Sequence, residues 1–197
     1  MEALSLASPD SRSLGGPVAY LGALLYVAFL IAVHIAQPHM LHEGTISKYA
    51  LGHDGWLMQA AFISAGLGFA GVASLLRGRA AVALWIGVVA FVVMGLFKID
   101  SVGPNNVVSL HGALHTIAFF AVVLLVHPAM FVLRRRFASR PLSLIAYAAP
   151  LLVVVGFAAP GLFGALVFRA WTLSLVAWVV LAAGALETDR FDAGFRR

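Results

Sequence analysis

Residues 80–97 read AAVALWIGVVAFVVMGLF, a run of eighteen residues without a charge between Arg79 and Lys98. A helix of this length, at about 1.5 Å per residue, approaches the roughly 30 Å thickness of membrane hydrocarbon. The whole chain shares this character, because its 197 residues are 62% hydrophobic and only 11% charged. Soluble domains carry roughly 25% charged residues. The run therefore predicts a membrane-spanning helix in a chain whose main solvent is lipid.

Five further apolar runs accompany this one, and each is close to the length of a membrane span. We expect an all-α, polytopic bundle of six transmembrane helices, occupying residues 17–187 as one domain. Residues 1–16 are predicted to be a disordered N-terminal tail, and residues 188–197 a cytoplasmic C-terminal tail. The six predicted spans are residues 17–37, 56–76, 80–97, 107–133, 142–159 and 165–186.

Basic residues predict the orientation of this bundle. With both termini in the cytoplasm, ten of the thirteen basic residues fall on the cytoplasmic side, as the positive-inside rule requires. Lys48, Lys98 and Arg169 fall on the outer side. We therefore expect a multi-pass protein of the cell membrane. The net charge of +5 follows from these loops, so it gives no reason to expect a nucleic-acid partner.

Residue types and motifs exclude several kinds of chemistry. The chain has no cysteine, which excludes disulfides, iron–sulfur clusters, thiolate zinc sites and a cysteine nucleophile. The phosphate-binding loop, the nucleophile elbow and the dinucleotide fingerprint are also missing from the sequence. Small residues four apart in the second span predict close helix packing, namely Ser64 with Gly68, and Gly66 with Ala70 and Ser74.

Histidines gather at the predicted outer end, which holds six of the seven. His111 and His115 are four residues apart, so they share one face of a helix, and this spacing suits two ligands of one metal ion. Asp100 precedes them on a short loop, and His34 lies near the outer end of the first span. We predict that these four side chains converge into a polar site that opens to the extracytoplasmic side, with a metal as one candidate occupant.

The connection between the first two spans supplies further candidates. Glu43, His53 and Asp54 are predicted to lie around the same site as second contributors. Within this connection, residues 46–51 predict a short interfacial helix, with Tyr49 at the level of the lipid headgroups. Histidines at a membrane boundary also cap helices or contact water, and this structural role is the alternative for each of them. The seventh, His127, precedes a proline and predicts a kinked turn.

Three short motifs resemble a known family, the bacterial and archaeal membrane proteins called domain of unknown function 998. They are ISKYALG at residues 46–52 leading to Trp56, GLFKID at residues 95–100, and His111-Gly112-x-x-His115. Lys98 departs from the family's Phe-Pro-x-Asp pattern, which has a proline at this position. The resemblance implies six helices over about residues 17–187, and it implies no reaction.

Three classes of function fit these observations. The first is proton-linked transport, sensing or assembly, because histidine titrates near a pH of about 6.5. The second is a membrane-embedded hydrolase or transferase acting on lipid, with zinc held by His111, His115 and Asp100. The third is haem binding, with His34 and either His111 or His115 as axial ligands. The bilayer is the one partner that the sequence implies directly, and a small-molecule or lipid substrate is compatible with all three.

Overall fold

The computed structural model describes residues 14–42, 45–101, 108–137, 139–159 and 161–195, and over this part of the chain it contains helices and no strand. Six helical stretches are long and apolar enough to span a membrane, which confirms the predicted all-α bundle. They are α1 (Gly15–Ala36), α2 (Gly55–Ser74), α3 (Arg79–Leu96), the stretch Leu110–Phe137, α6 (Arg140–Ala158) and α7 (Gly161–Phe195).

The fourth stretch is not one regular α-helix. It consists of α4 (Leu110–Ala121), a π-helical turn (Val122–Val126) and α5 (His127–Phe137). Pro128 has no N–H to donate to the carbonyl four residues earlier, so the regular hydrogen-bond ladder cannot continue through it. The sequence predicted a break at His127, and the structure has the wider turn immediately before that residue.

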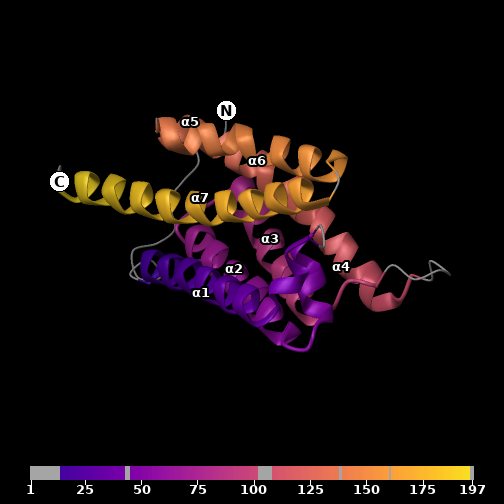
Figure 1. The fold of residues 1–197 in the computed structure, drawn as a ribbon. Helices are drawn as coiled ribbons and strands as arrows, with labels where there is room; N and C mark the ends of the chain where they lie inside the picture. The colour runs from indigo at the N-terminus through magenta and orange to yellow at the C-terminus, as the bar shows by residue number, and fades with distance from the viewer. Residues whose placement is uncertain (1–13, 43–44, 102–107, 138, 160, 196–197) are drawn as a thin grey trace.

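The bundle has two chemically different ends (Figure 1). The start of α1, the end of α7 and the α2–α3 and α5–α6 turns lie at one end, here called the arginine end, which includes Arg77, Arg79 and Arg134–Arg136. The opposite histidine end contains the starts of α2, α4 and α7. It also contains two short 3-10 helices between α1 and α2, η2 (Pro38–His42) and η3 (Ile46–Leu51). The predicted short helix at residues 46–51 is thus confirmed.

Large apolar side chains cover the perimeter of the bundle. Leu24, Ile31, Val89, Leu124 and Val154 are each more than half exposed, although they lie in the middle of spanning helices. In water this exposure would be unfavourable, whereas lipid tails solvate such side chains well. The protein is therefore a multi-pass membrane protein whose outer surface contacts the bilayer.

Helices α1 and α2 approach one another closely along a glycine seam, formed by Gly22, Gly68 and Gly71 together with Ala19. A Cβ atom on Gly22 would lie 2.6 Å from the Cα of Gly68, and one on Gly71 would lie 2.5 Å from the carbonyl oxygen of Gly15. The predicted close packing of Ser64 and Gly68 occurs here, against α1. Gly66 instead faces α3, where a Cβ atom added to it would lie 3.3 Å from the Cβ of Phe91 and from the carbonyl oxygen of Val88.

The last helix extends further than the apolar pattern indicated. We predicted that the sixth span ends at Glu187, but α7 continues to Phe195. Its first turns lie at the histidine end beside η3, and the middle of the helix packs against α1, α2 and α6. This central position brings α7 into contact with α1, η3, α2 and α6, which form part of the site described next.

Candidate functional site

A partly open cavity of about 170 Å³ lies in the bundle, lined by side chains from α1, η3, α2, α3, α4, α6 and α7. Its walls are mainly apolar, and they include eight aromatic side chains: Phe62, Phe69, Phe91, Phe119, Phe120, Phe157, Phe168 and Trp171. Six polar residues interrupt this lining: Tyr26, Thr45, Ser47, His115, Thr116 and Thr172. An apolar chamber with a few polar groups is typical of a small-molecule site.

Ser47 and His115 form a buried hydrogen-bonded pair on the wall of this cavity. The Ser47 hydroxyl donates to Nε2 of His115 over 3.0 Å, while Nδ1 of His115 donates to the carbonyl oxygen of Phe97 over 2.8 Å. The carbonyl can only accept, so it fixes the tautomer in which Nε2 is free to accept the serine proton. A hydroxyl, a base and a group that orients the base are thus arranged in series.

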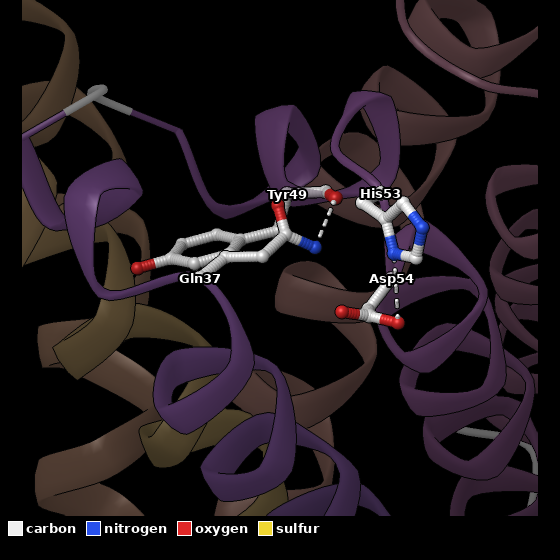
Figure 2. Close-up of polar contacts among 4 residues, drawn as sticks. All are labelled: Gln37, Tyr49, His53 and Asp54. Atoms are coloured by element: carbon white, nitrogen blue, oxygen red, sulfur yellow. Dashed lines mark hydrogen bonds and ion pairs between the residues drawn. The ribbon is translucent and has the colours of Figure 1, made fainter.

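The η3 segment that carries Ser47 is held in place by Gln37 at the end of α1. The Gln37 side-chain amide donates to the carbonyl oxygen of Tyr49 over 3.3 Å, and this contact is buried. Figure 2 shows the contact, with the Tyr49 ring pointing away from the His53–Asp54 pair on the other side of η3. Because Gly52 has no side chain, the Gln37 amide can lie against it.

Arg169 of α7 forms the second polar cluster. It is buried, with 8% of its surface exposed, and its three guanidinium nitrogens donate to three neutral acceptors. Nε donates to Nε2 of His34 over 2.8 Å, NH2 to the Tyr49 hydroxyl over 3.1 Å, and NH1 to the carbonyl oxygen of Ala165 over 2.7 Å. Within the residues that the structure describes, no carboxylate pairs with this cation.

His34 and Tyr49 complete this cluster. Nδ1 of His34 donates to the carbonyl oxygen of Leu30 over 2.7 Å, which leaves Nε2 as the acceptor for Arg169. The His34 and Tyr49 rings lie 4.7 Å apart, and the Arg169 guanidinium carbon is 5.5 Å from the centre of the Tyr49 ring. The Tyr49 side chain is fully buried inside the protein, where its hydroxyl accepts the hydrogen bond from Arg169.

Tyr26 of α1 is a buried residue of the cavity wall. Its side chain is 2% exposed, and its hydroxyl has no hydrogen-bond partner among the described residues. The same side chain lines the cavity together with Thr172 and lies near Thr172 and Arg169, but no described residue meets its hydroxyl with hydrogen-bond geometry. An unpartnered buried hydroxyl is costly, so this group is available to a ligand.

Asp100 has a different role from the one that its proximity to His111 suggested. Its carboxylate accepts hydrogen bonds from the backbone N–H and the hydroxyl of Ser109, and the Ser109 hydroxyl accepts in turn from the N–H of Gly112 over 3.0 Å. Ser109 is the N-cap of α4, and a carboxylate near a helix N-terminus is stabilising. Asp100 therefore anchors the start of α4, and Gly112 gives its carboxylate the space to do so.

The four predicted site residues accordingly have separate sets of partners. His34 contacts Arg169, His115 contacts Ser47, Asp100 contacts Ser109, and His111 is exposed with its ring edge against Phe97. In the described part of the chain, no group of three or more histidine, aspartate or glutamate side chains is close enough to hold a metal ion. Both ring nitrogens of His34 and of His115 make hydrogen bonds within the protein.

The predicted second contributors do not reach the cavity. His53 and Asp54 form a surface contact of 3.4 Å, with the His53 side chain 96% exposed. Glu43 lies outside the described residues. The sequence reasoning missed Ser47, Tyr26 and Arg169, yet one of them had a clear signal. Arg169 is a charged residue inside the sixth apolar run, and ionisable residues within a span usually serve a function.

The model of the family described as protein of unknown function, DUF998, matches residues 20–185. The match covers most of the chain, including α2, α3, α4 and α6 in full and most of α1 and α7, and it agrees with the resemblance of the three short motifs. The chain belongs to this family. No match was found among curated proteins or among solved structures.

Proposed function

We propose that this member of the family binds a lipid-like small molecule inside its helix bundle. The single observation that carries the proposal is the cavity of about 170 Å³ with its aromatic lining. An apolar cavity of about 150 Å³ accepts a molecule such as benzene, so this one accepts several methylene groups of a longer chain. The polar residues on its wall, Ser47, His115 and Tyr26 among them, then contact the polar part of the ligand.

An energetic argument supports occupancy of the cavity. Unfilled core volume is costly, at roughly 24 cal/mol per Å³ in lost packing, so leaving the chamber empty would be unfavourable. Many proteins have a total stability of only about 5–15 kcal/mol. A ligand with an apolar chain recovers part of this loss when it binds.

Binding of a fluorescent fatty-chain probe to the purified protein tests the proposal. Ala65 lines the cavity, and Ala65→Phe fills it with an aromatic ring. Ala170→Phe is the matched control, because Ala170 is exposed on α7 and does not line the cavity. We expect saturable binding that Ala65→Phe abolishes and Ala170→Phe preserves. Equal binding by the two variants would show that the probe sits on the outer surface.

We further propose that the histidine end faces the extracytoplasmic side, because ten of thirteen basic residues then lie in the cytoplasm. Reporter tags at residues 78 and 138 are expected to read cytoplasmic, and tags at residues 45 and 103 extracytoplasmic. An extracytoplasmic signal at residue 138, next to the three arginines at 134–136, would reverse this orientation.

A second candidate function is acyl transfer or hydrolysis at Ser47, favoured by the Ser47–His115–Phe97 hydrogen bonds. The Ser47 oxygen would bond to the acyl carbon of an ester as its proton passes to Nε2 of His115. That proton leaves with the alcohol, and water then releases the acid by the same route. This route needs only the two side chains, whereas the predicted zinc enzyme required three ligands.

Labelling with an alkyl fluorophosphonate, which reacts with activated serines, tests this second candidate. We expect labelling of the wild-type protein that is lost in Ser47→Ala and in His115→Ala. Ser64→Ala is the control, because the Ser64 hydroxyl donates to the carbonyl of Ala60 in its own helix. Labelling that persists in Ser47→Ala, or that never occurs in the wild type, would rule out a nucleophilic Ser47.

A further inference from the structure

We infer that Arg169 binds the anionic head of the ligand, so that the ligand is a single-chain amphiphile with a carboxylate or phosphate at one end. This inference rests on the proposed function, because the cavity receives the chain of the same molecule. It adds the chemical class of the ligand and the residue that selects it.

The charge on Arg169 is the first step in the argument. A guanidinium remains protonated in proteins, and removing it from water costs several kcal/mol unless a counter-charge is present. Arg169 is buried, and in the described chain its partners are an imidazole, a phenol and a carbonyl. These acceptors orient the cation without neutralising it, so a bound anion is the missing partner.

The geometry of the guanidinium is the second step. Arginine has five N–H donors, and three hydrogen bonds to the described residues use three of them. Two N–H groups, one on each terminal nitrogen, are left for a ligand. Paired N–H groups of a guanidinium suit two oxygens of one carboxylate or phosphate.

The position of Arg169 relative to the cavity is the third step. Thr172 and Val176 follow Arg169 by three and seven residues, so all three share one face of α7. Both Thr172 and Val176 line the cavity, and Thr172 is also bonded to the carbonyl oxygen of Arg169. Arg169 itself is not one of the residues that line the cavity, so a ligand with its anionic head at Arg169 reaches the aromatic chamber past Thr172, one turn further along α7.

Tyr26 is the independent observation that points to a ligand. Tyr26 lines the cavity, and its buried hydroxyl lies near the side chains of Arg169 and Thr172 without the geometry of a hydrogen bond to any described residue. A phenol at this point can donate a hydrogen bond to an oxygen of the same head group. Arg169 and Tyr26 thus approach the head from α7 and α1, respectively.

Binding of four ligands with the same eighteen-carbon chain tests the inference: oleate, oleoyl lysophosphatidic acid, oleyl alcohol and oleylamine. We expect the two anions to bind at least about tenfold more tightly than the alcohol, which corresponds to one charge-assisted hydrogen-bonded contact. Oleylamine is expected to bind more weakly still. The stronger of the two anions identifies the source, a fatty acid or a phosphate-bearing lipid.

Substitutions then assign the preference to Arg169. Arg169→Gln is expected to remove the advantage of the anions while leaving oleyl alcohol unchanged, and Lys98→Gln, at an exposed cation of the same end, is expected to leave all four affinities unchanged. Tyr26→Phe removes one hydroxyl and retains the ring. It therefore provides a second test of head-group binding if Arg169→Gln does not fold. We expect it to weaken the anions about threefold or more.

Three outcomes separate the two proposals. If no ligand binds the wild-type protein, the proposed function fails. If all four bind equally, or if folded Arg169→Gln and Tyr26→Phe keep the anion preference, the cavity binds chains but the inference about Arg169 fails. If Glu43→Gln destabilises the protein as much as Arg169→Gln does, the chain supplies its own counter-ion, and the inference is again overturned.

Discussion

The two sides of α2 are packed in opposite ways. Toward α1, the backbones touch: Gly71 leaves no space for a methyl group, and neither does Gly22 of α1, which lies against the backbone of Gly68. Toward α3, α4 and α7, Phe62, Ala65 and Phe69 of the same helix border a cavity of about 170 Å³. One helix thus joins a close-packed pair to an open chamber.

This difference indicates a division of labour within the bundle. In a membrane, helices associate through close van der Waals contact, since lipid tails are as apolar as the side chains. The glycine seam provides such contact and keeps α1 and α2 together as a rigid pair. The cavity lacks such van der Waals contacts, which lowers the stability of the bundle. A stability loss of this kind is commonly found where a protein binds a ligand.

The largest effect is expected from adding one methyl group to the glycine seam. Gly71→Ala would place its Cβ 2.5 Å from the Gly15 oxygen and 2.7 Å from the Ala19 Cα, and these backbone atoms cannot rotate away. We expect a loss of about 2–3 kcal/mol in the free energy of unfolding in detergent micelles.

Gly66→Ala is the matched control on the same helix. Its nearest contacts lie at 3.3 Å, toward α3, and alanine has a better helix propensity than glycine by up to about 1 kcal/mol. We expect its stability to stay within about 1 kcal/mol of the wild type. Equal losses in the two variants would show that the seam is no tighter than the α2–α3 contact.

A smaller effect is expected from the polar wall of the chamber. Ser47→Ala removes the donor to Nε2 of His115, a side chain that is 2% exposed. An orphaned buried acceptor costs about 1–3 kcal/mol. We expect a loss of about 1–2 kcal/mol in the same unfolding assay, with Ser47→Thr as the control that restores the hydroxyl.

The sequence predicted the fold well and the site only in part, for a physical reason. Apolar runs such as residues 80–97 report burial in lipid directly, since each span needs about twenty apolar residues. A site depends on which side chains of different helices contact each other, whereas spacing along the sequence predicts proximity only for residues of the same helix. His111 and His115 do share α4, yet His115 alone turns inward, to Ser47 of η3, 68 residues away in the sequence.

Asp100 and Arg169 illustrate the same limit of sequence reasoning: Asp100 was placed in the site although its partners lie elsewhere, and Arg169 was left out of it. The nearness of Asp100 to His111 in sequence suggested a shared site. The Asp100 carboxylate instead accepts a hydrogen bond from Ser109 and stabilises the N-terminus of α4, whose first N–H groups have no partner within the helix. Arg169 was interpreted as a topological charge at a boundary. Its partners, His34 and Tyr49, come from α1 and η3, and no local pattern in the sequence connects them.

The third prediction concerns the open side of α2 and has the opposite sign. Ala65→Leu adds three carbons at the border of the cavity. Filling a cavity commonly stabilises a protein by about 0.5–2 kcal/mol, so we expect a gain of about 1 kcal/mol in the ligand-free protein together with weaker binding of the fatty-chain probe. Destabilisation with unchanged binding would mean that the space beside Ala65 is already filled.

The smallest effect distinguishes the two histidines of α4. His111→Ala removes an exposed ring whose described contact is the edge of Phe97, and exposed substitutions away from buried networks usually change stability by less than about 0.5 kcal/mol. We expect unfolding, probe binding and fluorophosphonate labelling to match the wild type. His115→Ala, on the same helix face, removes a buried ring with two hydrogen bonds and is expected to change all three. A large loss of binding or labelling in His111→Ala would show that His111 belongs to the site, and it would support the hypothesis that His111 and His115 act as paired ligands.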